Sequence, residues 1–403
     1  MPRLRLTPQQ NKDFRLFVRL CRKSLIAVEG YGNPILPDLL LRHSEAPTLL
    51  NLLLSLSSEM DTSETTSSPA KTYDLYDRAL REIQTSILRC EEVNDPYALL
   101  AAIAGANILV VLSTDGSNHD WQHHAKHVIQ IIDCADLNEI KSTPEGLFLS
   151  SLTAGFDIET FAIGRTTAPT YAWSRWEIDK ALEPTTDGFQ PYEISAGYPA
   201  SLVSIIAELG KFAAANQTTL QFPGTVDPTL ATEWARLNLA LKSWEPPSLP
   251  NNMPQHQSFA LRIARRNIQR AAMLYHGRRH GFHSNLVAPL LEEEKDLNNL
   301  VEDILVGVRQ LINVYRAHGS TIANSMAWSL AVVGSECGSN KNKHLQREFL
   351  DMMEEMANLF YMTHLRYLGS ICASIWQRQS EGLCGYVSLE SVAREQDLCL
   401  LFM

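Results

Sequence analysis

The clearest pattern of apolar and polar positions lies in the C-terminal third of the chain. After residue 296, apolar side chains recur at steps of three and four, which is the spacing of one helix face turned toward a core. This stripe consists of Leu297, Leu300, Val301, Ile304, Leu305, Val308, Leu311, Ile312 and Tyr315. Residues 326–336 are apolar almost all round and predict a central helix that is buried on most sides. Two more amphipathic helices follow, one carrying Phe349, Met352, Met353 and Met356 and one ending at Trp376.

Helical patterns fill most of the remaining chain, whereas the alternation typical of strands is nearly absent. Two predicted helices begin at the steps Thr7-Pro8 and Thr143-Pro144, where Thr can cap the helix and Pro fits its first turn. Further helices are expected near residues 47–56, 71–90, 97–112, 119–132, 143–164, 198–215, 227–244 and 257–276. The sequence therefore predicts an all-α fold, with roughly twelve or more helices packed around a buried central helix in one domain over residues 1–403.

Two segments interrupt the helical pattern. Residues 61–69 are rich in Ser and Thr and are expected to form a mobile loop. Residues 166–197 contain several Pro, Thr and Trp residues without a clear period. We therefore expect them to form an irregular, extended excursion on the surface.

Composition narrows the class of protein. Apolar residues make up 45% of the 403 positions and charged residues 20%, as in an ordinary globular protein. The net charge of −10 opposes general affinity for nucleic acid, because a duplex-binding surface must neutralise phosphates. No apolar run is long enough to span a bilayer, so no membrane contact is expected.

Cysteine usage excludes two kinds of site. There are seven cysteines, and the closest two, Cys372 and Cys384, are twelve positions apart. No Cys-x-x-Cys pair is present, so neither a thiolate zinc site nor a thioredoxin-like motif is formed. The odd number and the absence of a visible secretory leader favour a reducing, intracellular setting.

A histidine cluster is the first candidate site. His119, His123 and His127 are each four positions apart, so one helix face would present all three imidazoles, an arrangement found in metal sites. In the alternative interpretation, Trp121 and His124 face the core and the other histidines are solvated. Three ligands from one helix rarely surround a tetrahedral ion, so we favour the second interpretation and assign no metal.

A basic strip is the second candidate site. Its ligand-binding candidates are Arg266, Arg270, His276 and Arg279, which could bind an anionic ligand or an acidic partner. The favoured alternative is a solvated helix face whose cations complement the C-terminal end of the helix dipole. Nucleophile elbows, phosphate loops and nucleotide fingerprints are absent, so no catalytic residue and no cofactor are assigned.

Four segments carry a resemblance to a known family. They are Trp121-x-x-His124 with Ile131-Ile132, the step Phe156-Asp157-Ile158, the run from Trp328-Ser329-Leu330 to Gly334-Ser335-Glu336 with Arg347, and the late helix from Leu365 to Trp376. An apolar tail from Leu398 to Phe402 closes the chain. Together they resemble the all-helical regulatory (middle homology) domain of fungal-specific transcription factors. The chain departs from the family pattern at two places: His127-Val128 replaces small residues and Ser329 replaces a Pro.

The resemblance implies a regulator of transcription rather than an enzyme. It implies residence in the nucleus, with the cytoplasm left open as a second location, and control of a metabolic pathway or gene cluster, including secondary metabolism. The zinc binuclear cluster that precedes this domain in the family needs six closely spaced cysteines, and residues 1–35 contain only Cys21. We therefore expect no direct DNA binding by this chain. The expected partners are other transcription regulators or a small-molecule effector, and a homodimer is left open.

Three alternatives remain from the sequence. The first is a metabolite-binding protein or enzyme that uses the His119/His123/His127 face of the same helical scaffold. The second is a purely structural partner subunit. The third is a gene whose upstream exon encodes the missing cysteines.

Overall fold

The computed structural model describes residues 120–182, 191–215, 228–281, 294–338, 343–381 and 388–402, together with short stretches between residues 7 and 110. The predicted mobile loop at 61–69 and most of the predicted N-terminal helices lie outside the described residues. Within the described part, the elements are fourteen α-helices, two 3₁₀ helices and two short strands. The prediction of an all-α fold with many packed helices is confirmed.

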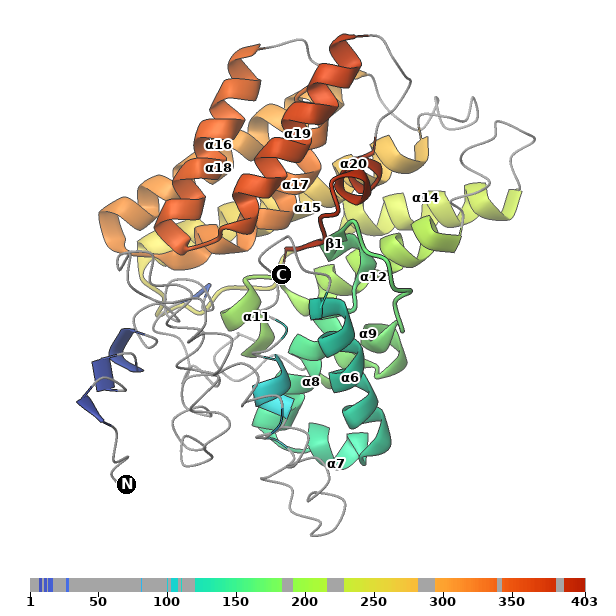
Figure 1. Ribbon diagram of the computed structural model, residues 1–403, viewed down its shortest axis with the longest axis vertical. Coiled ribbons are helices and arrows are strands. Elements are labelled where there is room, and N and C mark those ends of the chain that lie inside the picture. Colours follow the sequence, from blue (N-terminus) through green and yellow to red (C-terminus); the bar gives the residue numbers. More distant parts are fainter. Residues whose placement is uncertain are drawn as a thin grey trace.

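The elements fall into two groups that can be followed in Figure 1. The first group contains α6 (Asp120–Cys134), α7 (Leu137–Lys141), α8 (Pro144–Phe156), η1 (Glu159–Phe161), β1 (Ala162–Ile163), α9 (Ala172–Arg175), α10 (Ile178–Ala181), α11 (Pro191–Ala196), α12 (Ala200–Ala215) and α14 (Pro228–Ser243). The second contains α15 (Gln255–Gly281), α16 (Glu294–His318), η2 (Thr321–Met326), α17 (Ala327–Glu336), α18 (Lys343–Phe360), α19 (His364–Ser380), α20 (Leu389–Glu395) and β2 (Leu400–Leu401).

Helix α17 is the buried centre of the second group. All ten of its residues are buried, and it packs against α15, α16, η2 and α19. Helix α16 turns its apolar stripe toward this centre, since Val301, Ile304 and Val308 are fully buried. The central helix predicted from the sequence is therefore present at the expected place.

Gly334 permits the close approach of α17 to its neighbours. A Cβ atom at this position would lie 2.5 Å from Cys372 Sγ and 2.5 Å from Phe349 Cζ, which is too close for any real contact. Trp376 of α19 donates its indole N–H to the Gly334 carbonyl at 2.8 Å. The absence of a side chain thus brings α17, α18 and α19 into one packed core.

The C-terminal tail joins the two groups. Strand β2 pairs antiparallel with β1, with Leu401 opposite Ala162 and Leu400 opposite Ile163. The Phe402 N–H donates to the Phe161 carbonyl at 2.8 Å. As Figure 1 shows, the chain end lies beside β1, between the two groups of helices. The predicted apolar tail is therefore part of the core.

Two local predictions were wrong. Helix α8 ends at Phe156 and does not continue to residue 164, because the chain turns through η1 into β1. The described parts of residues 166–197 are not a surface excursion: they form α9, α10 and α11, and Trp173, Trp176 and Tyr192 are buried. Helices of four to six residues are too short for a helical period to show in the sequence.

Candidate functional site

The tryptophans of the sequence motifs are structural anchors. Trp121 Nε1 donates to the Cys399 carbonyl at 3.2 Å, and Trp328 Nε1 donates to the Thr160 carbonyl at 2.7 Å. Both side chains are almost completely buried. Each indole thus donates a hydrogen bond to a backbone carbonyl in a distant part of the chain. A buried carbonyl needs such a donor, because no water reaches it.

Asp157 holds the segment that follows β1. Its carboxylate accepts hydrogen bonds from Arg165 Nη2 at 3.0 Å, from Thr170 N and Oγ1 at 2.9 Å, and from Ala172 N at 2.9 Å. The Asp157–Arg165 ion pair is nearly excluded from solvent, with side-chain exposures of 1% and 9%. The Arg165 guanidinium also lies 5.9 Å from the centre of the Trp121 ring. The aromatic-Asp-aliphatic step therefore organises a loop, and its carboxylate is fully engaged.

Gln122 is a second organising residue, and sequence reasoning missed it. Its Oε1 accepts from the Thr166 and Thr167 backbone N–H groups at 3.0 Å each, while its Nε2 donates to Cys399 Sγ at 2.9 Å. Burial raises the pKa of the Cys399 thiol to about 11, so it stays protonated and is a poor nucleophile. The signal that could have found Gln122 is its place beside Trp121 on the buried face of α6.

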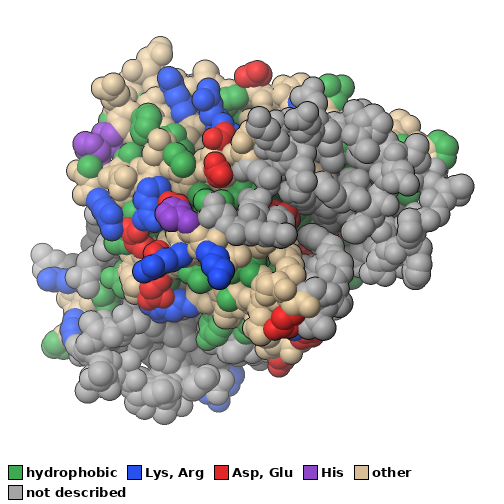
Figure 2. Space-filling model, turned by 90° about the horizontal axis from the view of Figure 1, so that it is seen from above, with side chains coloured by type: hydrophobic (Ala, Val, Ile, Leu, Met, Phe, Trp, Pro, Cys, Tyr) green, Lys and Arg blue, Asp and Glu red, His purple; other side chains and the backbone are tan. Residues whose placement is uncertain are grey.

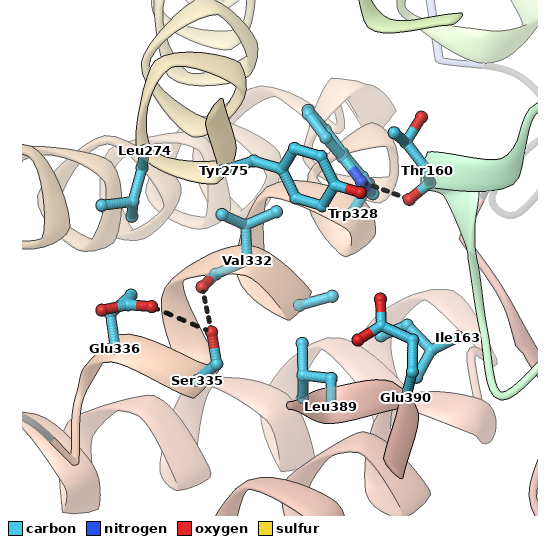
Figure 3. Close-up of a pocket in the computed structure, with 11 residues that line it drawn as sticks. Thr160, Ile163, Leu274, Tyr275, Trp328, Val332, Ser335, Glu336, Leu389 and Glu390 are labelled. Atoms are coloured by element: carbon cyan, nitrogen blue, oxygen red, sulfur yellow. Dashed lines mark hydrogen bonds between the residues drawn. The ribbon is translucent and has the colours of Figure 1, made fainter. Parts of the chain in front are cut away.

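A small hollow lies beside Trp328 (Figure 3). Tyr275 and Trp328 form its aromatic wall, Val332 and Leu389 contribute apolar surface, and Glu390 points toward it from α20. Its volume is ≈ 30 Å³, which is room for about two water molecules. In this conformation the Trp328 hollow cannot hold a metabolite.

A larger hollow, of ≈ 130 Å³, lies between the end of α8, η1, α9, α10 and α12. We call it the acidic hollow, because its lining residues include four acidic ones, Asp157, Glu159, Asp179 and Glu208, and one basic one, Lys211. Its apolar walls come from Ala154, Ile158, Tyr171, Trp173 and Ala207. Trp173 is fixed in place because its Nε1 donates to Ser204 Oγ at 2.9 Å. This is the more spacious of the two hollows and the candidate for a small ligand.

Tyr171 stands at the rim of the acidic hollow. Its side chain is 37% exposed, and its backbone is left-handed, with φ of 58°. Such a conformation is costly for a bulky residue and is found most often at functional sites. Burial, and after it the neighbouring carboxylates of Glu159 and Asp157, raise the pKa of the Tyr171 hydroxyl.

Comparison with known proteins decides the family. The profile of the fungal specific transcription factor domain matches residues 15–401. The chain belongs to this family. No curated protein and no solved structure matches the chain. Membership supports a role in the regulation of transcription.

The histidine candidates of this family member lie on a solvent face. His123 and His127 are exposed on α6, His124 is half-buried and Trp121 is fully buried, while His119 lies outside the described residues. Within the described part of the chain, no group of three His, Cys, Asp or Glu side chains could hold a metal ion. The described residues therefore add no further metal ligand to His123 and His127.

The basic candidates on α15 do not share one environment. Arg266 is exposed, and Arg270 pairs with Asp303 of α16 at 2.8 Å. His276 is buried: it stacks on Trp234 with ring centres 4.7 Å apart, and its Nε2 lies 3.1 Å from the Trp234 carbonyl. The side chain of Arg279 lies outside the described residues. The three described side chains therefore lie in three different environments: exposed, paired with an acidic residue, and buried against an aromatic ring.

Arg265 shows what the basic-strip interpretation overlooked. It is 1% exposed and forms a buried ion pair with Glu193 of α11, across 72 positions, while its Nη1 donates to the Pro247 carbonyl at 2.6 Å. Arg265 therefore ties α15 to α11 inside the core.

Among the described residues, no helix is long and apolar enough to cross a membrane.

Proposed function

We propose that the chain is a transcriptional regulator or co-regulator of a fungal metabolic pathway or gene cluster. It acts through contacts of its helical domain with another regulator or with a small-molecule effector, and not by reading DNA itself. The observation that carries the proposal is the family match, which takes up residues 15–401 of the 403. Within this sequence no six closely spaced cysteines are available to build the family's DNA reader.

The distribution of charge supports the same proposal. The chain has a net charge of −10, whereas a DNA-binding surface gathers Lys and Arg to neutralise phosphates. On the face seen in Figure 2, the described Lys and Arg side chains lie among Asp and Glu side chains. Several of the described cations are engaged in ion pairs: Arg366 pairs with Glu354, and Arg309 and Arg316 pair with Glu355. Mixed surfaces of this kind suit contacts with proteins.

A tethering experiment tests the regulatory role. The full chain is fused to a bacterial DNA-binding domain and brought to a reporter promoter in a fungal host, with the unfused DNA-binding domain as the control. We expect the fusion to change reporter output in either direction. Unchanged output, from a fusion that is folded and present in the nucleus, would contradict the proposal.

A binding experiment tests the absence of direct DNA reading. The purified chain is titrated into a pool of random duplexes at several salt concentrations. We expect no sequence enrichment. Enrichment of a defined sequence, with affinity that falls steeply as salt rises, would show that the chain reads DNA after all.

A further inference from the structure

The apolar tail crosses from one group of helices to the other. We call residues 398–402 the strap, and all five are buried. Its β2 part pairs with β1, and the Cys399 carbonyl accepts the indole N–H of Trp121 on α6 at 3.2 Å. The Phe402 ring meets the ring of His364 on α19 edge-on, with centres 5.6 Å apart. The strap thus lies against α6, β1 and α19 at once, between the two groups in Figure 1.

Burial of apolar side chains, rather than charge, holds the strap in place. Four of its five side chains are apolar, and the fifth is the Cys399 thiol, which stays protonated. Its ladder with β1 is two residues long, and a two-stranded pairing is marginally stable by itself. The Gln122 amide donates to Cys399 Sγ, but a thiol is a weak acceptor. Each of these polar bonds can therefore be exchanged for a bond to water at little cost.

The closed strap carries an opposing cost at His364. The Nε2 atom of His364 is buried and has no hydrogen-bond partner among the residues that the structure describes. Burial lowers the pKa of His364 to about 4. A buried polar atom without a partner disfavours the state that buries it, because it has lost its bond to water. Phe402 covers this ring, so its departure would let water reach His364 and would relieve the cost.

The strap begins at a defined turn after α20. The Asp397 N–H donates to the Arg394 carbonyl at 3.1 Å, and the Leu398 N–H donates to the Ala393 carbonyl at 2.8 Å. These bonds form a common C-terminal stop of a helix, in which Asp397 has a left-handed backbone with φ of 55°. Glycine is the usual residue there, and Asp adopts this conformation less readily. Rotation of the backbone just after this turn can therefore swing the strap away without unwinding α20.

Other contacts keep the two groups of helices together when the strap is away. Trp328 of α17 donates to the Thr160 carbonyl of η1, and Arg265 of α15 pairs with Glu193 of α11. Neither contact includes a residue of the strap. Opening of the strap can therefore be local, with both groups still folded and joined.

We propose that the strap is a releasable closure, which opens as a unit while the helices stay folded and thereby uncovers Trp121, Gln122 and the edge of β1. In the closed state it hides an edge that can pair with a strand; in the open state that edge is free. Release is a property of this chain alone and does not depend on a role in transcription.

Alkylation of the four described cysteines in the full chain tests the proposal. Cys134 is exposed, whereas Cys337, Cys372 and Cys399 are buried. The chain is treated with iodoacetamide, and mass spectrometry follows the labelling of each cysteine over time. We expect Cys134 to react first and Cys399 next, at a rate at least about tenfold above those of Cys337 and Cys372, which are reached only when the core opens.

Two outcomes of the alkylation would overturn the proposal. If Cys399 reacts as slowly as Cys372, the strap leaves only when the core unfolds. If Cys399 reacts as fast as Cys134, the strap is not closed in solution. Both results come from the unmodified chain, so neither depends on a variant that folds poorly.

Two matched phenylalanine variants separate opening of the strap from unfolding of the core. Phe402→Leu loosens the strap and should raise the labelling rate of Cys399 by up to about tenfold, with Cys372 unchanged. Phe349→Leu, at a fully buried residue of α18, should raise the rate of Cys372 and leave that of Cys399 unchanged. Equal effects of either variant on both cysteines would show that strap and core open together and would overturn the proposal.

His364→Leu tests the cost assigned to the closed state. An apolar side chain needs no hydrogen bond, so this variant should hold the strap closed and slow the labelling of Cys399 at least about fivefold. Labelling that is faster or unchanged would contradict a strap that is poised to open by His364. Thermal unfolding of each variant confirms that it is folded before it is labelled.

Discussion

Trp328 on the central helix donates its indole N–H to the carbonyl of Thr160, a residue 168 positions earlier in the chain. The same ring meets Phe161 edge-on, with ring centres 5.4 Å apart. The tryptophan of the α17 motif therefore fastens the second group of helices to the η1–β1 turn of the first. Its role is to join the two groups, and the small hollow beside it is a consequence of that packing.

Replacing Trp328 by Phe should destabilise the domain. The change leaves the buried Thr160 carbonyl without its donor, which costs about 1–3 kcal/mol, beyond any loss of packing. The matched control is Trp244→Phe. Trp244 Nε1 donates to the hydroxyl of Ser201, which is exposed, so water can replace the indole as the hydrogen-bond donor. Chemical denaturation measures both free energies of unfolding. Equal losses in the two variants would show that the Trp328–Thr160 bond adds nothing specific.

Two glycine substitutions should act in opposite directions. Gly334→Ala forces a methyl group against Cys372 and Phe349 and should cost about 1–3 kcal/mol. Gly369→Ala in α19 meets only Leu350 Cδ2, at 3.4 Å, and should gain about 0.5–1 kcal/mol from helix propensity. Thermal unfolding of both variants against the unmodified chain gives the sign of each change. A neutral Gly334→Ala would mean that α17 can move away from its neighbours.

The sequence predicts the burial of long helices, because the apolar pattern within one helix shows which of its faces is turned to the core. Residues 327–336 are apolar almost all round, and α17 is buried all round; the stripe of α16 faces inward as its period requires. The tertiary links could not be predicted in this way. Asp157 binds residues 13 and 15 positions away, and Glu193 meets Arg265 across 72. Pairs between such distant positions produce no repeating pattern in the sequence from which they could be predicted.

The candidate site was predicted even less well, for a related reason. Sequence reasoning selected clusters of His and Arg along single helices, such as His123 and His127, because neighbours in the chain are easy to see. The acidic hollow instead combines Tyr171, Asp179 and Lys211 from three separate helical segments. The chain turns after α8 and then runs through η1, where the sequence pattern predicted that the helix would continue. That turn helps to bring these residues to one place.

Asp157→Asn should be far more damaging than loss of a surface carboxylate. It leaves the guanidinium of Arg165, which is only 9% exposed, without its counter-charge, and breaking a buried pair costs about 3–5 kcal/mol. The control Glu177→Gln removes the exposed ion pair with Lys180 and should change stability far less, because solvent screens that pair. Denaturation midpoints at constant pH measure the difference. Similar midpoints for both variants would mean that water reaches Arg165 and replaces Asp157.

Acid should destabilise the domain partly through His276. Burial lowers the pKa of His276 to about 4, from an ordinary value of 6.5, so the unfolded chain binds the proton more readily than the folded chain. The contribution of His276 to the free energy of unfolding is therefore at its maximum above about pH 6.5 and is lost as the pH falls toward 4. Between pH 6.5 and pH 5 this contribution falls by about 1.5 kcal/mol. His276→Phe, which can keep the stack on Trp234, should remove that share of the pH dependence, whereas His344→Gln, at a side chain that is 83% exposed, should leave it intact. Urea denaturation of the three proteins at pH 6.5 and 5 measures the difference. If His276→Phe loses as much stability over this interval as the unmodified chain, His276 accepts a proton in the folded state and its pocket is open to water.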